Sequence, residues 1–111
     1  MKLESLKWED RGVYRVAKGF ELSNDCFTQI VEVKPKKEVK KHYHEKQTEI
    51  FVIIGGEAIM GIGDKVYSAK TGDVFICRPK ERHWVKNYGN EPFRILVFKY
   101  NYAENDIFWE E

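Results

Sequence analysis

Short segments rich in β-branched and aromatic residues recur along this chain, and sequences that favour turns separate them. Seven segments are expected to form strands: residues 27–33, 49–54, 58–62, 66–69, 74–77, 83–87 and 93–100. Glycine, proline, asparagine and lysine punctuate the intervals between them, for example at 55–56, 63–65 and 88–90. Many short strands on short turns, without a long helical pattern, are typical of a β-sandwich or β-barrel. The sequence therefore predicts an all-β fold.

The histidines of the chain, three in all, are grouped around these predicted strands. His42 and His44 are two residues apart, so on one strand both side chains would point to the same face. Glu49 follows His44 at an odd offset, so a turn in residues 45–48 must return it on a neighbouring strand. His83 begins another predicted strand. Three imidazoles and one carboxylate form a donor set suited to a first-row transition metal.

The spacing of these residues resembles the two sequence motifs of the cupins, a family of small β-barrels. The first motif reads G-x5-H-x-H-x3-4-E-x6-G, and the chain matches it from His42 to Gly56. The second reads G-x5-P-x-G-x2-H-x3-N, and Gly72, His83 and Asn87 fall in register with it. The two motifs span residues 36–87. The resemblance implies an antiparallel cupin barrel of the jelly-roll, or double-stranded β-helix, type, formed by residues 1–111 as a single domain.

The chain departs from both motifs at turn positions. Lys36 and Lys80 stand where the motifs have glycine, Arg78 stands where the second motif has proline, and Pro79 comes one place late. These differences concern the shape of loops and leave all four ligand positions filled. Asn87, at the last position of the second motif, is expected to be a structural hydrogen-bonding residue.

His42, His44, Glu49 and His83 are therefore the predicted ligands of one divalent transition-metal ion per chain. They would fill four positions of an octahedron and leave two for water, oxygen or substrate. Fe, Mn, Ni, Co, Cu and Zn all accept such ligands, so the sequence does not choose among them. One carboxylate against a divalent ion leaves an excess positive charge, which favours an anionic small-molecule ligand.

The alternation of side chains along a strand suggests which residues surround this ion. Phe51 and Ile53 share a face with Glu49, so they are expected to line the barrel interior beneath the metal. Three basic residues on the turn before His83 could form a cationic rim that receives an acidic substrate, although basic turn residues are commonly only solvated: Arg78, Lys80 and Arg82.

The opposite face of the same strand is apolar as well, with Ile50, Val52 and Ile54. A strand that is apolar on both faces is normally covered on both. We therefore expect a partner subunit on the outer face, in a two-fold homodimer. The alternative is that apolar residues near the N-terminus fold over this face, namely Leu3, Leu6 and Trp8.

Composition excludes some partners. The net charge is +1 with 33% charged residues, so no global field attracts nucleic acid or a membrane surface. No apolar run is long enough to cross a bilayer, and the N-terminal residues lack the core of a signal peptide. A cytoplasmic location is therefore expected. Cys26 and Cys77 are too few for a disulfide framework and are expected to be thiols.

Three classes of function remain open on these residues. The first is a metal-dependent oxidoreductase of dioxygenase type that acts on a small anion. The second is an isomerase, epimerase or lyase for a sugar or keto acid, in which the metal polarises a carbonyl and a nearby base moves a proton. The third is a non-catalytic sensor or binding module for a small ligand.

Overall fold

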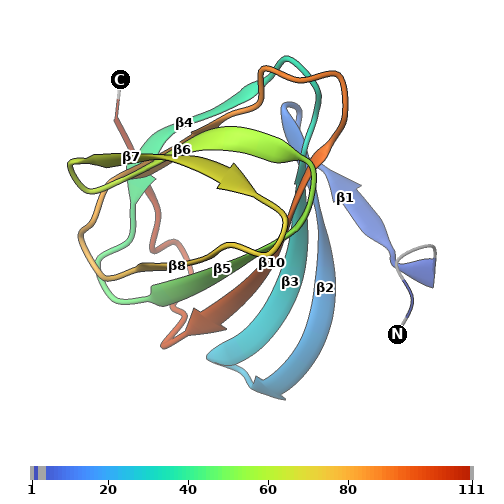
Figure 1. Cartoon of the computed structure of the whole chain (residues 1–111). Helices are drawn as coiled ribbons and strands as arrows, with labels where there is room; N and C mark the ends of the chain where they lie inside the picture. The colour runs from blue at the N-terminus through green and yellow to red at the C-terminus, as the bar shows by residue number, and fades with distance from the viewer. Residues whose placement is uncertain (1, 3–4, 111) are drawn as a thin grey trace.

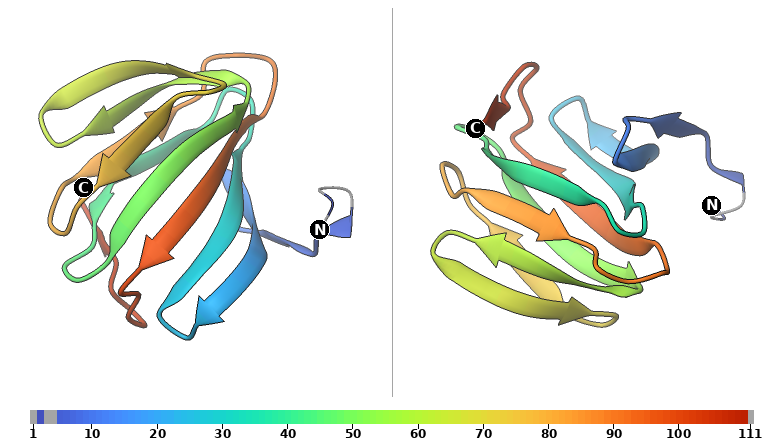
Figure 2. Two further views of the ribbon diagram at one scale, coloured as in Figure 1. Left: turned by 60° about the horizontal axis from the view of Figure 1, so that its bottom comes forward. Right: turned by 90° about the horizontal axis from the view of Figure 1, so that it is seen from above.

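The computed structural model describes residues 2 and 5–110, and the strands in these residues form two antiparallel sheets that face each other (Figures 1 and 2). One sheet has six strands in the order β1-β2-β3-β10-β5-β8, and the other has five in the order β11-β4-β9-β6-β7. The strands are β1 (Trp8–Asp10), β2 (Tyr14–Ser23), β3 (Cys26–Val33), β4 (Glu38–Tyr43), β5 (Thr48–Gly55), β6 (Glu57–Ile62), β7 (Lys65–Lys70), β8 (Val74–Cys77), β9 (His83–Lys86), β10 (Phe93–Tyr100) and β11 (Phe108–Trp109). The predicted all-β fold of jelly-roll type is confirmed.

All seven strands expected from the sequence are present, with boundaries that differ by at most one residue. The strand expected to carry His42 and His44 is β4, which ends at Tyr43. Strands β1, β2 and β11 were not expected. The second half of β2 is exposed, so burial imposes little hydrophobic alternation on it. Strands β1 and β11 are very short and lie at sheet edges. In the part of the chain that the structure describes, no helix has the length and apolar character needed to cross a membrane.

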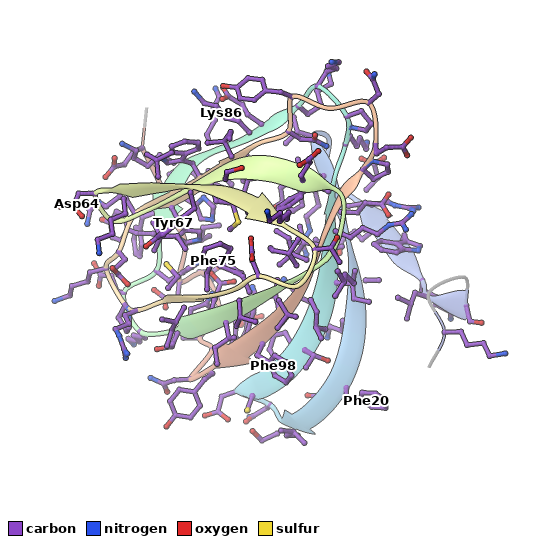
Figure 3. All side chains as sticks on the ribbon, viewed as in Figure 1. Phe20, Asp64, Tyr67, Phe75, Lys86 and Phe98 are labelled. Atoms are coloured by element: carbon purple, nitrogen blue, oxygen red, sulfur yellow. The ribbon has the colours of Figure 1, made fainter. Side chains whose placement is uncertain are left out.

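The hydrophobic core lies between the two sheets. Tyr67 of β7 and Phe75 of β8 point toward each other there, with ring centroids 5.0 Å apart (Figure 3). The best-buried apolar side chains come from both sheets: Val33, Ile53, Met60, Phe93 and Val97. A second group of buried residues is polar and lies toward one side of this core; it contains the three histidines and Glu49. Apolar packing thus holds the sheets together and leaves one region for chemistry.

The motif positions that call for glycine all take a left-handed backbone conformation here. Gly56 and Gly72 have φ of 75° and 98°, while Lys36 and Lys80 have φ of 63° and 71°. A side chain with a Cβ is strained in this region, and glycine is not. The two lysines therefore keep the turn shapes expected of the motifs at a cost in conformational energy.

Lys80→Gly is expected to raise the free energy of unfolding by about 0.5–1 kcal/mol, because relief of the strained φ exceeds the entropy that glycine adds to the unfolded chain. Chemical denaturation of the metal-free protein measures this. Lys65→Gly is the matched control: that lysine is an exposed strand residue outside the positive-φ set, so its replacement should lower stability. A Lys80→Gly protein less stable than the parent would contradict the strain argument.

The outer face of the six-stranded sheet carries two apolar rows that run across neighbouring strands. Cross-strand partners point to the same side of a sheet, so the register defines each row. One row contains Val74, Val52, Leu96 and Ile30, and the next contains Ile76, Ile50, Phe98 and Thr28. Several of these side chains are open to solvent, including Val74 at 61% and Phe98 at 42%, and Phe98 lies on the outer side of the barrel (Figure 3).

The N-terminal segment reaches only the β3 end of these rows, where Trp8 shares the row of Ile30 through Ala17, and it leaves β5 and β8 uncovered. Trp8 belongs to β1, which pairs with β2 at the far edge of the six-stranded sheet, away from β5 and β8 (Figure 1). Its ring instead contacts the guanidinium of Arg15, 4.0 Å from the ring centroid. Leu6 is half-buried, and Leu3 lies outside the described residues. The described chain thus leaves the rows open on β8, β5 and β10, whereas Ile30 on β3 is buried.

Candidate metal centre

The three histidines converge between the sheets, and the register of two strands explains how. His42 on β4 pairs directly with His83 on β9, and His44 follows β4 by one residue. Val39 and His42 are three residues apart, so on a regular strand their side chains would point to opposite faces. A register irregularity between them lets the side chains of Val39 and His42 both face inward. All three imidazoles are buried, and one ring nitrogen of each lies within 4.8 Å of the others.

The second nitrogen of each ring, Nδ1, lies near a backbone carbonyl oxygen. A carbonyl oxygen only accepts, so Nδ1 is the donor and Nε2 is left with a free lone pair. The contacts are 2.8 Å from His42 to Lys40, 2.5 Å from His44 to Asp106 and 3.3 Å from His83 to Glu81. This is the tautomer and the orientation that metal coordination through Nε2 needs.

Glu49 completes the cluster from the opposite sheet. Its Oε1 atom lies 2.9 Å from Nε2 of His44 and 3.4 Å from Nε2 of His83. The atom is buried, and at these short distances it still has no partner in hydrogen-bond geometry. Two ligand atoms about 2.1 Å from one ion and about 90° apart would themselves be about 3 Å apart. The three histidines could therefore hold a divalent transition-metal ion, and such an ion would also satisfy the unpaired oxygen of Glu49 beside two of them.

The charge states of these groups suit a cation. Burial lowers the pKa of His42 to about 4, and nearby His83 adds to this effect, so the imidazole is neutral at pH 7. The pKa of Glu49 lies well below the usual range: burial opposes its ionisation, and the positive charge of Lys99 is among the effects that favour it. A carboxylate close to a neutral imidazole suits the binding of a divalent ion.

A cavity of about 100 Å³ adjoins the cluster. It is small compared with the roughly 300–1,000 Å³ of sites for drug-sized ligands. Phe51 lines it as expected, whereas Ile53 lies deeper in the core and outside the lining. Most of the wall is apolar, and its polar residues other than the cluster are Arg11, Tyr14, Gln29 and Lys99. Sequence reasoning missed these four residues. Lys99 could have been found, because it is two residues beyond Val97 and four beyond Ile95 and so lies on the same inward face of β10.

The three predicted rim residues lie elsewhere. Arg78, Lys80 and Arg82 are absent from the cavity lining, and each is largely exposed. Arg82 is adjacent to His83 in the chain and therefore points to the other side; its Nε is 2.5 Å from a carboxylate oxygen of Glu110 and its guanidinium covers the ring of Tyr43. Their part in receiving a substrate stays a prediction, and their position gives it no support.

The family model for the cupin domain matches residues 29–99. The chain belongs to the cupin family. The matched region contains the three histidines and Glu49; it begins within β3 and ends within β10. A comparison with curated protein sequences gives no match.

Solved structures share the fold of this cupin. A Thermotoga maritima protein described as a "predicted oxalate decarboxylase" is 22% identical, with a TM-score of 0.81 over 91% of this chain and 97% of the other. An uncharacterised conserved protein with a double-stranded β-helix domain from Klebsiella pneumoniae is 23% identical, with a TM-score of 0.82 over 100% and 96%. Oxalate decarboxylase from Lactobacillus farciminis, in a formate complex, is 23% identical, with a TM-score of 0.78 over 96% of this chain and 34% of that one.

Asp106, in the segment between β10 and β11, holds part of the cluster in place, and no sequence pattern indicated this role. Its carboxylate accepts hydrogen bonds of 2.8–3.2 Å from three successive backbone N–H groups, those of residues 45–47. Its own carbonyl oxygen accepts from His44. One residue thus shapes the turn that brings Glu49 back and also orients a histidine. Trp109 further along packs on His42, with ring centroids 4.5 Å apart.

Two other buried polar groups of the barrel have structural contacts. Asn87 is buried and donates to the carbonyl oxygens of Val33 and Glu91, at 3.2 and 2.9 Å, as expected of a structural residue. Cys77 places its Sγ 3.3 Å from Nδ1 of His83. Burial raises the pKa of this thiol to about 12, with Glu49 adding to the effect, so it is a neutral thiol at pH 7.

Proposed function

We propose that this cupin is a metal-dependent enzyme of oxidoreductase type, dioxygenase-like, that acts on a small anionic molecule. His42, His44, Glu49 and His83 would hold one divalent ion. The observation that carries this proposal is the buried and unpaired Oε1 of Glu49, which faces the Nε2 atoms of two histidines beside a cavity. A closed structural site would leave no such space next to its ligands.

The surroundings of the cluster support a small substrate. A bound redox-active ion would supply electron transfer and polarisation of a substrate oxygen. The chain's own residues enclose the substrate: Phe51, Val97 and Ile107 are among the apolar side chains of the wall and limit the access of water. Two of the similar structures are named as oxalate decarboxylases, one of them as a prediction. Small carboxylic acids are therefore the first substrates to test.

The test is oxygen consumption and product formation by protein loaded separately with Fe(II), Mn(II), Co(II), Ni(II), Cu(II) or Zn(II). A panel of small mono- and dicarboxylic acids is offered to each form. Oxygen uptake that needs both a redox-active ion and an acid, and that Glu49→Gln abolishes, is the expected result. Turnover without oxygen uptake would instead favour an isomerase or lyase. Thermal stabilisation by an acid without any turnover would favour a binding module.

We also propose that the protein is a homodimer formed through the outer face of the six-stranded sheet. The two rows across that face contain seven apolar residues and one threonine, with no charge. A contiguous apolar surface of this kind typically marks an interface. A second copy of the chain, related by a two-fold axis, would set one pair of rows against the other.

Two further proposals follow from less specific features. Both cysteines are free thiols, Cys26 half-buried and Cys77 buried, which fits a reducing cytoplasmic location. The two sheets share one core cluster that draws on strands from β3 to β10, which supports residues 1–111 as one domain.

A further inference from the structure

Lys99 stands beside the candidate metal centre because of the pairing of two strands. It is the direct cross-strand partner of Glu49 in the β5–β10 ladder, so both side chains point into the barrel. The next inward row along the same sheet contains Phe51, Val97 and Gln29. Lys99 and Gln29 both line the cavity next to the cluster.

The ammonium group of Lys99 makes no direct contact with an acidic side chain in the described part of the chain, although the charge of Glu49 across the ladder attracts it. The close contacts of the Glu49 carboxylate are to His44 and His83, and among the described residues Lys99 forms no ion pair. The ring of Tyr102 lies near this group, with its centroid 5.5 Å from Nζ. A half-buried charge without a partner is unfavourable in a small barrel unless something binds it. Burial correspondingly lowers the pKa of Lys99.

A second feature shows where a ligand would extend. A cleft of about 200 Å³ shares three lining residues with the cavity, namely Arg11, Gln29 and Lys99. Beyond them the cleft is polar, with Lys18, Asn24 and Glu21 on its walls. The three shared residues therefore stand at the junction between the metal-side cavity and the outside. Arg11 adds a second positive charge there, which its exposed contact with Glu9, at 3.2 Å, only partly offsets.

We propose that Lys99, with Gln29 and Arg11, binds a second anionic group of the substrate, so that the substrate is a short dicarboxylate. One carboxylate would lie toward the four candidate ligands and the other at the junction. This inference rests on the proposed function, because it assumes that the first carboxylate reaches a bound metal. A charge-assisted hydrogen bond from an ammonium to a carboxylate is among the stronger single contacts available. The cavity of about 100 Å³ limits the chain between the two carboxylates to a few carbon atoms.

The experiment uses the full chain loaded with Co(II), whose visible spectrum reports a ligand at the metal. Malonate is compared with monomethyl malonate, which is similar in size but carries one negative charge. The parent is expected to bind malonate at least about 10-fold more tightly, or about 1.4 kcal/mol. Lys99→Met should remove that preference without changing the Kd for monomethyl malonate or the Co(II) content. Lys99→Arg should restore most of it, and Lys65→Met, on the exposed strand β7, should behave as the parent.

Several outcomes would overturn the inference. If Lys99→Met weakens the binding of malonate and of monomethyl malonate equally, the lysine acts only through the charge of the metal centre. If Lys99→Met lowers the Co(II) content, the lysine only positions Glu49. If the variant keeps the preference for malonate, the second carboxylate binds elsewhere, and the proposed function still stands. If neither anion changes the spectrum of the parent, the proposed function fails together with this inference. Should Lys99→Met not fold, Arg11→Met at the exposed junction must reduce the preference several-fold, and an unchanged preference would refute the inference.

Discussion

His83→Ala is expected to lower the affinity for a divalent transition metal by at least about 100-fold. The substitution removes one of the four proposed ligands, whose side chains the folded barrel already orients for binding. The parent, purified without chelator, should carry up to about one ion per chain. Elemental analysis after dialysis measures the content, and competition with a chromophoric chelator measures the affinity. The variant should still fold, since the imidazole borders a cavity and the apolar core lies mainly elsewhere. We expect a loss in stability of about 1–2 kcal/mol in the metal-free state.

Tyr43→Phe is the control for this result. Tyr43 lies between His42 and His44 in the chain but stacks on Phe108, at 5.2 Å between ring centroids, on the outer side of the barrel. Its replacement should leave metal content and affinity unchanged. A parent protein that stays empty when offered all six ions would refute the metal centre. An equal loss of metal in the control variant would show that the effect of His83→Ala is not specific to a ligand.

Val52→Glu is expected to convert a dimer into monomer or aggregate. Val52 lies in the outer apolar row between Val74 and Leu96, so in a dimer the new carboxylate would be buried without a partner. Such a charge costs several kcal/mol, about what a small interface of this kind can supply. Size exclusion coupled to light scattering should report twice the chain mass of 13.2 kDa for the parent and the single mass for the soluble variant.

Val66→Glu is the matched control, because Val66 is also an exposed strand valine, 65% accessible, but belongs to β7 of the other sheet. That variant should remain dimeric and as stable as the parent. A parent that is monomeric at tens of micromolar would refute the dimer. A dimer that persists in Val52→Glu would place the interface on another face.

Much of the fold and of the candidate site could be predicted because both depend on short-range patterns. Strands such as β5 and β10 are recognisable from β-branched residues bounded by turns, without reference to any partner. The spacing of His42, His44 and Glu49 indicates one strand, a turn and a second strand by side-chain alternation alone. Even the departures at Lys36 and Lys80 left the turns intact, since a lysine can take a positive φ at a tolerable cost.

The parts that sequence reasoning missed depend on which segments pair and in what register. Lys99 faces Glu49 because β10 lies between β3 and β5, and nothing local to either residue indicates that order. Asp106 reaches the turn at 45–47 from the far end of the chain, through a segment with no strand pattern. The expected basic rim illustrates the same point, because Arg82 is next to His83 in sequence but on the opposite side of the barrel.

The sequence by itself determined the all-β character of the chain, its membership of the cupins and the four residues that gather at the candidate metal centre. These follow from period-two alternation and from the fixed spacings inside the two motifs, residues 36–56 and 72–87. Only the tertiary structure decided what surrounds the centre: a small cavity, an unpaired lysine at its exit, a C-terminal aspartate behind His44 and an uncovered apolar sheet face. Those features arise from contacts between segments that are distant in the chain, and such contacts are selected by the packing of the whole barrel, for which local sequence patterns carry no signal.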